Sequence, residues 1–182
     1  MTLPFKSIAV IGAGPLGWQL ALDAARAGYN VVLEDVLPSR LRNAAAGMQQ
    51  GVAALAVADV GAVLARIQFA ATVEDAVREA DIAIDGVPDE LESKLEIFSM
   101  IDRMAPPRTV LCSPLRAVSI ADLAACTYRA AQCVGVRVER EFVELEHASF
   151  TDPQVIDRVA EFWRSLGKEV RVTADTREFA ET

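Results

Sequence analysis

Three glycines near the N-terminus have the spacing of a phosphate-binding turn. Gly12, Gly14 and Gly17 lie in the segment GAGPLG, between the apolar run SIAVI and a segment with apolar residues at helical spacing. In such a strand–turn–helix unit, the glycines allow a tight turn, close approach of the backbone to a pyrophosphate, and packing of the helix on the strand. The start of the helix adds unpaired N–H groups and a partial positive charge. The spacing therefore predicts that this segment binds a dinucleotide.

A carboxylate follows at the end of the second apolar run. Asp35 lies 18 residues after Gly17 and closes the segment NVVLED. A carboxylate at this position accepts hydrogen bonds from ribose hydroxyls and repels a 2′-phosphate, which selects NAD over NADP. Glu34 either adds to that repulsion or is a solvated strand end. Arg40 could receive a 2′-phosphate, but the two carboxylates lie nearer in the sequence, so we expect NAD.

The segment CVGVRVEREFVELEH, Cys133 to His147, is a second candidate for chemistry. It contains the only histidine of the chain, among alternating apolar and charged residues. A histidine beside a carboxylate is a common general base. Glu144 and His147 are three residues apart, however, so on a strand their side chains point to opposite faces. We therefore interpret His147 as a surface or strand-end residue.

The elements that must position these residues alternate between strands and helices. Strands are expected at 7–12, 30–35 and 81–87, in RIQFAA, TVLCS and KEVRVT, and once or twice within 133–147. The helices between them include a long one from Ser39 to about Ala65, broken near Asp59–Gly61, and one with an apolar stripe of Leu91, Leu95, Phe98 and Ile101. This alternation predicts an α/β fold with a doubly wound, mostly parallel sheet, the Rossmann fold. We assign residues 1–175 to one nucleotide-binding domain and 176–182 to a polar tail.

Composition excludes several classes of partner. The 182 residues carry a net charge of −8, which argues against nucleic acid or an anionic membrane as a partner. The N-terminal segment has no uninterrupted apolar run of about 20 residues, so we expect no membrane span. Cys112, Cys126 and Cys133 lack zinc-site spacing, so we expect no metal and three buried structural thiols in a cytoplasmic protein.

Several segments resemble the NAD-binding domain of the 3-hydroxyacyl-CoA dehydrogenases. They are IAVIGAGPLG, AGYNVVLEDV, TVEDAVREADIAIDGVPDELESKLEIF, SIADLA and RVAEFWRSLGKEVRV, in the same order along nearly the whole chain. The resemblance implies an NAD-dependent oxidoreductase of fatty acid metabolism. It places Asp89 and Lys94 at the NAD site, although Asp89 is one methylene shorter than the family's glutamate. The other cofactor contacts that we expect beside the three glycines and Asp35 are Pro15, Leu16, Val87 and Ser113.

The resemblance weakens at the residues that perform catalysis. In the family a histidine takes the substrate's hydroxyl proton, a glutamate holds that histidine, and a serine and an asparagine position the substrate. By register, Arg137 replaces the histidine, Arg116 the substrate-binding serine and Pro114 the asparagine, while Glu144 matches the glutamate. Arginine stays protonated and cannot act as a base. Arg137 and Glu144 form either an ion pair in place of the dyad or two unrelated strand charges. The segment Asn43 to Ala65, where the family has lysines for the CoA phosphates, contains neither lysine nor arginine.

Three functions remain open at this point. The chain is an oxidoreductase with weak or altered activity on some hydroxy or oxo compound, a catalytically silent NAD(H) sensor or assembly partner, or half of an enzyme that another chain completes. The resemblance places a helical domain after VRVTADTREFAET, where the sequence ends. We expect the alanine-rich helix to form a homodimer, NAD(H) to bind, and a small-molecule substrate, if there is one, to be unidentified by the sequence.

Overall fold

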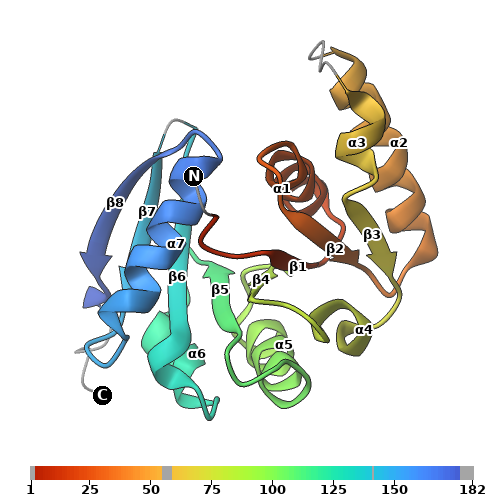
Figure 1. Ribbon diagram of the computed structural model, residues 1–182. Coiled ribbons are helices and arrows are strands. Elements are labelled where there is room, and N and C mark those ends of the chain that lie inside the picture. Colours follow the sequence, from red (N-terminus) through yellow and green to blue (C-terminus); the bar gives the residue numbers. More distant parts are fainter. Residues whose placement is uncertain (1–2, 55–58, 141, 177–182) are drawn as a thin grey trace.

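Eight strands form one sheet at the centre of the protein (Figure 1). The computed structural model describes residues 3–54, 59–140 and 142–176. The strand order is β3-β2-β1-β4-β5-β6-β7-β8, and all neighbours are parallel except the antiparallel pair β6–β7. The order reverses between β1 and β4, which is where open α/β sheets bind their ligands. The predicted Rossmann fold is confirmed.

Strands and helices alternate from the first strand to the sixth. The strands are β1 (Ser7–Ile11), β2 (Asn30–Glu34), β3 (Ile67–Ala70), β4 (Ile82–Asp85), β5 (Val110–Pro114), β6 (Cys133–Val138), β7 (Phe142–His147) and β8 (Glu169–Ala174). The helices are α1 (Pro15–Arg26), α2 (Pro38–Ala54), α3 (Val60–Leu64), α4 (Val73–Val77), α5 (Leu91–Met104), α6 (Ile120–Ala125), the 3₁₀ helix η1 (Ala130–Gln132) and α7 (Pro153–Ser165).

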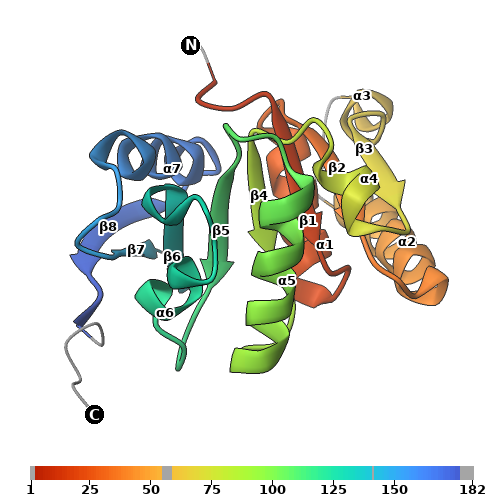
Figure 2. The ribbon, with the colours of Figure 1, turned by 90° about the horizontal axis from the view of Figure 1, so that it is seen from below.

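Helices cover both faces of the sheet, as Figures 1 and 2 show. Helices α1, α2, α3 and α7 pack on one face, and α4, α5 and α6 pack on the other. Alternate residues of each central strand enter the two cores. In β1, Ile8 and Val10 belong to the first core, whereas Ala9 and Ile11 belong to the second. A strand buried on both faces reads as a continuous apolar run, which explains SIAVI.

The predicted long helix is two helices. Helix α2 ends at Ala54 and α3 begins at Val60, so the chain does break before Gly61, and residues 55–58 lie outside the described part. Asp59 caps α3, because its Oδ1 accepts the N–H of Ala62 at 2.9 Å. The aspartate in this apolar stretch was thus a helix-start signal.

Helix α5 buries a different stripe from the one that apolar spacing predicts. Phe98 and Ile101 are fully buried as expected, but Leu91 is 48% exposed. Lys94 is buried instead, with 0% exposure. A charged side chain is buried at tolerable cost only when a partner compensates it. Lys94 finds such partners at the ends of β4 and β5.

Two of the three cysteines are buried, and the third is not. Cys112 and Cys133 are buried, whereas Cys126 at the end of α6 is exposed, which corrects the expectation of three buried thiols. Burial raises the pKa of the Cys133 thiol to about 12 and also raises the pKa of Cys112. These two thiols therefore stay protonated and serve packing.

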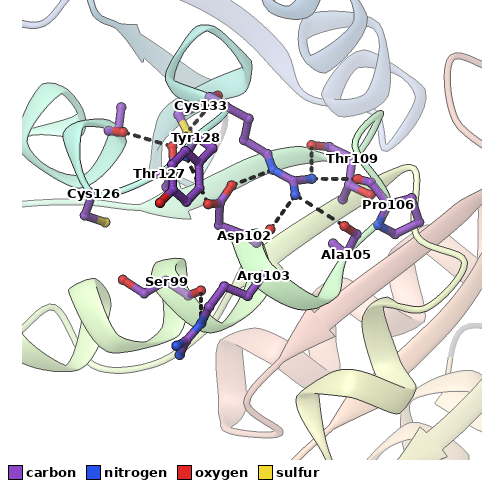
Figure 3. Close-up of polar contacts among 12 residues, drawn as sticks. Ser99, Asp102, Arg103, Ala105, Pro106, Thr109, Cys126, Thr127, Tyr128 and Cys133 are labelled. Carbon is purple, nitrogen blue, oxygen red and sulfur yellow. Dashed lines mark hydrogen bonds and ion pairs between the residues drawn. The ribbon is translucent and has the colours of Figure 1, made fainter.

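A half-buried arginine closes the C-terminal end of α5, where Figure 3 shows Asp102, Ala105 and Pro106. Arg129 donates from Nη2 to the carbonyl oxygens of Asp102 at 2.6 Å and Ala105 at 3.2 Å, and from Nη1 to that of Pro106 at 2.6 Å. Its Nε bonds the Asp102 carboxylate at 2.8 Å. The last carbonyls of a helix have no partner within it. One guanidinium, from 25 residues further along the chain, supplies those partners after α5.

We expect Arg129→Met to lower the free energy of unfolding by about 3 kcal/mol, because the Asp102 carboxylate is then buried without its cation. The control is Arg103→Met, since Arg103 is exposed and bonds one carbonyl, that of Ser99. Its expected cost is within about 0.5 kcal/mol. Urea unfolding followed by circular dichroism measures both, and equal effects of the two substitutions would contradict this role for Arg129.

Candidate functional site

Two glycines between β1 and α1 are required by the protein's own packing. A Cβ added at Gly17 would lie 1.9 Å from the carbonyl oxygen of Gly12. Gly12 itself has a φ of +100°, where side chains are strained. Helix α1 therefore lies directly on the end of β1 only because both positions lack a side chain.

Gly14 has no such internal reason to be glycine. Its φ of −66° and ψ of 179° suit any residue, and an added Cβ would meet nothing within 4 Å. It is the N-cap of α1, where serine, threonine or aspartate would normally accept N–H bonds from the first turn. A glycine here leaves those amides open to an anion. This open N-terminus fits the pyrophosphate of a dinucleotide.

Pro15 and Leu16 form the first turn of α1 at this open end. Pro15 is the first helical residue, where its fixed φ suits the helix and its missing N–H costs nothing. Leu16 is 43% exposed. Both residues lie where the glycine motif predicts, at the edge of the nucleotide-binding end of the sheet.

The turn after β4 packs directly on the glycine loop. Gly86 donates its N–H to the carbonyl oxygen of Ile11 at 2.7 Å, and a Cβ at Gly86 would lie 2.9 Å from that oxygen. The next residue, Val87, is half-buried and donates its N–H to Asp85 Oδ1 at 2.8 Å. The close approach therefore brings Val87 to the glycine loop, at the point where the strand order reverses.

Asp35 is held at both of its oxygens by backbone amides. Oδ2 accepts the N–H of Ala13 at 3.0 Å, and Oδ1 accepts the N–H of Leu37 at 2.9 Å. Nη1 of Arg40 lies 3.5 Å from Oδ2. Each carboxylate oxygen can accept a further hydrogen bond. The carboxylate thus lies beside the glycine loop, where a ribose-binding group is expected.

Glu34 lies inside the protein and is not a solvated strand end. It is 3% exposed, and its Oε1 is buried without a hydrogen-bond partner among the described residues. Burial raises its pKa to about 7, the charge of Asp35 adds to the rise, and the Gly12 N–H opposes it. At neutral pH this side chain is therefore divided between its neutral and charged forms. Its charge repels a 2′-phosphate less than the sequence suggests.

A buried ionic network joins the ends of β4 and β5. Lys94 Nζ lies 3.0 Å from Asp85 Oδ2 and 3.1 Å from Ser113 Oγ, and Ser113 donates to Asp85 Oδ2 at 2.8 Å. All three side chains are 0% exposed. Burial raises the pKa of Asp85, while Lys94 opposes that rise. The structure thus brings Lys94 and Ser113, two of the expected cofactor contacts, together around an aspartate that sequence reasoning missed. The available signal was an acidic residue that ends the apolar strand.

Asp89 holds a loop. Its Oδ2 accepts the backbone N–H groups of Arg116 and Ala117, both at 2.9 Å. Its Oδ1 is buried without a partner among the residues described. This carboxylate therefore fixes the loop between β5 and α6.

Arg137 and Glu144 face each other across β6 and β7, where they are register partners. Arg137 Nη1 donates to Glu144 Oε2 at 3.0 Å, and Nη2 donates to Glu146 Oε1 at 2.5 Å. The predicted ion pair is present, so these are not two unrelated charges. Glu146, which sequence reasoning missed, is its third member. Strand alternation was the available signal, because residues two apart share a face.

A cavity of about 310 Å³ opens beside this ion pair. It is lined by Arg116, Arg137, Glu144, Glu146, Thr173, Ala174, Asp175 and Thr176. Arg116 and Arg137, which lie far apart in the sequence, therefore share one cavity. Asp175, also missed, is 2% exposed and accepts hydrogen bonds from Ser119 Oγ at 2.7 Å and the Ile120 N–H at 2.9 Å. His147 ends β7 and is half-buried, as expected of a strand-end residue.

Comparison with known families agrees with this geometry. Residues 7–176 match the model of the family described as 3-hydroxyacyl-CoA dehydrogenase, NAD binding domain. The chain belongs to this family. Its cofactor is NAD, and the oxidoreductase lineage predicted from the sequence is confirmed at that level.

Relatives in the family are longer than this chain. A probable 3-hydroxybutyryl-CoA dehydrogenase of Bacillus subtilis is 30% identical over 98% of the chain and 60% of that protein. A 5-formyl-3-hydroxy-2-methylpyridine 4-carboxylate 5-dehydrogenase of Mesorhizobium japonicum is 28% identical over 89% and 55%. The crystal structure of (S)-3-hydroxybutyryl-CoA dehydrogenase from Ralstonia eutropha is 24% identical, with a TM-score of 0.89 over 97% of this chain and 66% of that one. The chain thus spans about 60% of the curated relatives' length.

No helix within the described ranges is long and apolar enough to span a bilayer.

We expect Glu34→Gln to stabilise the protein more at high pH than at low pH. The folded-state pKa of about 7 lies above the ordinary value of 4.5, so the wild type loses stability as pH rises between the two. The difference in unfolding free energy between variant and wild type should grow by about 2 kcal/mol from pH 5 to pH 8. Thermal or urea unfolding at both pH values measures it. The exposed Glu74→Gln is the control, and a pH-independent difference for Glu34→Gln would refute the burial argument.

Proposed function

We propose that this chain binds NAD(H) through the Gly12–Gly17 loop and Asp35, and does not oxidise 3-hydroxyacyl-CoA by the family's histidine route. When bound, NAD⁺ supplies a hydride acceptor. The first turn of α1 holds its phosphates, and Asp35 holds the adenosine ribose. Val87, Asp89, Lys94 and Ser113 are the further contacts we propose.

The residue at position 137 is the observation that supports the loss of the histidine route. Arg137 stands where the family has its histidine and is bonded to both Glu144 and Glu146. A guanidinium cannot take a proton from a substrate hydroxyl, because it stays protonated throughout the working pH range. Glu144 matches the glutamate that orients the histidine in the family. In this chain Glu144 is bonded to Arg137, which is a permanent cation.

The surroundings also favour a substrate other than an acyl-CoA. The segment Asn43 to Ala65 offers no cationic side chain for CoA phosphates. The cavity over Arg137 contains two arginines and three carboxylates, Asp175 included, so its lining carries a net charge of about −1. A negatively charged lining repels the phosphates of CoA.

Two functions of an NAD(H)-binding chain are compatible with this proposal. The chain is a silent NAD(H)-binding sensor or assembly partner, or a dehydrogenase with weak or altered activity on a smaller oxo or hydroxy compound. The lining of the cavity, which has both hydrogen-bond donors and acceptors, is the observation that favours the second form. Completion of the site by a helical domain from another chain is compatible with either form.

Self-association through α2, cytoplasmic location and a role in fatty acid metabolism stay predictions. In the part of α2 before residue 52, Ala44 and Met48 are buried against the body of the protein. The exposed positions include Arg42, Asn43 and Gln49. They supply little apolar surface for a dimer.

We expect Gly14→Ala to weaken NADH binding while leaving the fold intact. The added methyl meets no protein atom within 4 Å, yet it occupies the space in which a pyrophosphate would approach the backbone. Fluorescence titration should show at least a tenfold higher dissociation constant (about 1.4 kcal/mol) than for the wild type. Gly17→Ala is the contrasting variant and should fail to fold, because its Cβ would collide with Gly12 O. Unchanged NADH affinity in folded Gly14→Ala would contradict binding at this loop.

We also expect the wild-type chain to bind NADH without reducing acetoacetyl-CoA. Absorbance at 340 nm follows the reaction, with a full-length 3-hydroxybutyryl-CoA dehydrogenase assayed in parallel as the positive control. Turnover comparable to that of the control would refute the loss of the histidine route. Arg137→Met should change nothing in this assay, since the arginine takes no part in proton transfer.

A further inference from the structure

At the nucleotide-binding end, a cation lies beside Asp35, the carboxylate whose position normally excludes NADPH. Nη1 of Arg40 lies 3.5 Å from Asp35 Oδ2, and the Arg40 side chain is 59% exposed. We propose that Arg40 sets the choice between NADH and NADPH by receiving the 2′-phosphate of NADPH, so that this site takes both cofactors. The inference rests on the proposed binding of a dinucleotide at this site and adds a second cofactor to it.

Asp35 holds its position independently of Arg40. The carboxylate is 3% exposed and is bonded by the amides of Ala13 and Leu37, at 3.0 and 2.9 Å. It therefore stays beside the glycine loop when Arg40 moves. Arg40 lies in the first turn of α2, where its backbone N–H donates to the carbonyl oxygen of Leu37 at 2.9 Å. Both partners of the pair are thus held at the turn between β2 and α2, Asp35 through its carboxylate and Arg40 through its backbone N–H.

The charge that excludes a 2′-phosphate is largely neutralised here. An aspartate at the end of the second strand repels that phosphate when it stands alone. Here the guanidinium of Arg40 offsets the charge of Asp35 at 3.5 Å. Glu34, the other carboxylate, is buried at 3% exposure and divided between its neutral and charged forms at neutral pH. What remains at the surface of the site is an aspartate and an arginine with no net charge.

Arg40 is the mobile partner of this pair. Its side chain is 59% exposed, whereas the Asp35 carboxylate is 3% exposed and keeps its hydrogen bonds from the amides of Ala13 and Leu37 when Arg40 moves away. A guanidinium offers a planar set of donors that matches a phosphate in two parallel hydrogen bonds, which are stronger than the long contact with Asp35. With NADH bound, Arg40 stays on Asp35. With NADPH bound, the same side chain turns to the phosphate.

Helix α2 provides a matched control. Arg42 lies two residues after Arg40, is also exposed, and carries the same charge. In a helix, two residues correspond to about 200° of rotation, so Arg42 points away from the side on which Arg40 meets Asp35. Arg42→Gln therefore removes a positive charge from α2 without removing it from the site, which Arg40→Gln does.

The experiment is a fluorescence titration of the full chain with NADH and with NADPH, for the wild type, Arg40→Gln, Arg40→Lys and Arg42→Gln. We expect the wild type to bind NADPH within about tenfold of NADH. Arg40→Gln should raise the dissociation constant for NADPH by about tenfold or more and leave that for NADH within about threefold. Arg40→Lys should fall between, because it keeps the charge without the planar donors. Arg42→Gln should match the wild type for both.

Two results would overturn this inference alone. One is wild-type binding of NADH with NADPH weaker by about 100-fold or more, and the other is an equal loss of both nucleotides in Arg40→Gln. Binding of neither nucleotide by the wild type would overturn the proposed function and the inference together. Circular dichroism of each variant confirms that the exposed substitutions leave the fold unchanged.

Discussion

The close approach of α1 to the carbonyl oxygen of Gly12 is the constraint on which the nucleotide-binding end depends. It requires glycine at position 17, since any Cβ there would lie 1.9 Å from that oxygen. Once α1 is in place, Gly86 approaches Ile11 from β4, and Asp35 bonds the amide of Ala13 from β2. Three segments therefore meet at this end: the first two through backbone groups alone, and the third through the carboxylate of Asp35 on a backbone amide. Such an end of a sheet is positioned mainly by the main chain and tolerates change elsewhere.

The opposite half of the same sheet edge is built in another way. There, β6 and β7 carry charged side chains whose positions depend on one another, with Arg137 between Glu144 and Glu146. Arg137 and Glu144 are register partners, so this ion pair lies across the antiparallel strands. The two halves are joined mainly through β4 and β5 and share none of these contacts. Chemistry at β6 and β7 is thus free to change while the nucleotide-binding end is retained.

The sequence predicted the sheet, most helices and the glycine turn, because these follow from periodicity and local backbone rules. It predicted less about buried charge. It did not reveal that Lys94 is enclosed by Asp85 and Ser113, which lie on strands that only the folded sheet brings together. Glu34 was treated as a strand-end group, and its burial depends on the neighbouring strands β1 and β3. Arg129 was not singled out, because its partners lie more than 20 residues away in the sequence. Patterns along the chain reveal which residues are apolar, but the partner of a buried charge is a property of three-dimensional neighbours.

Asp175 ties the end of β8 to the opposite wall of the charged cavity. It follows β8 directly, and its carboxylate accepts hydrogen bonds from the hydroxyl of Ser119 and the amide of Ile120, at the start of α6. The loop that precedes α6 carries Arg116, which lines the cavity, and is held on its other side by Asp89. The position of the last strand and the shape of the cavity are therefore linked through the start of α6, so a change in one affects the other.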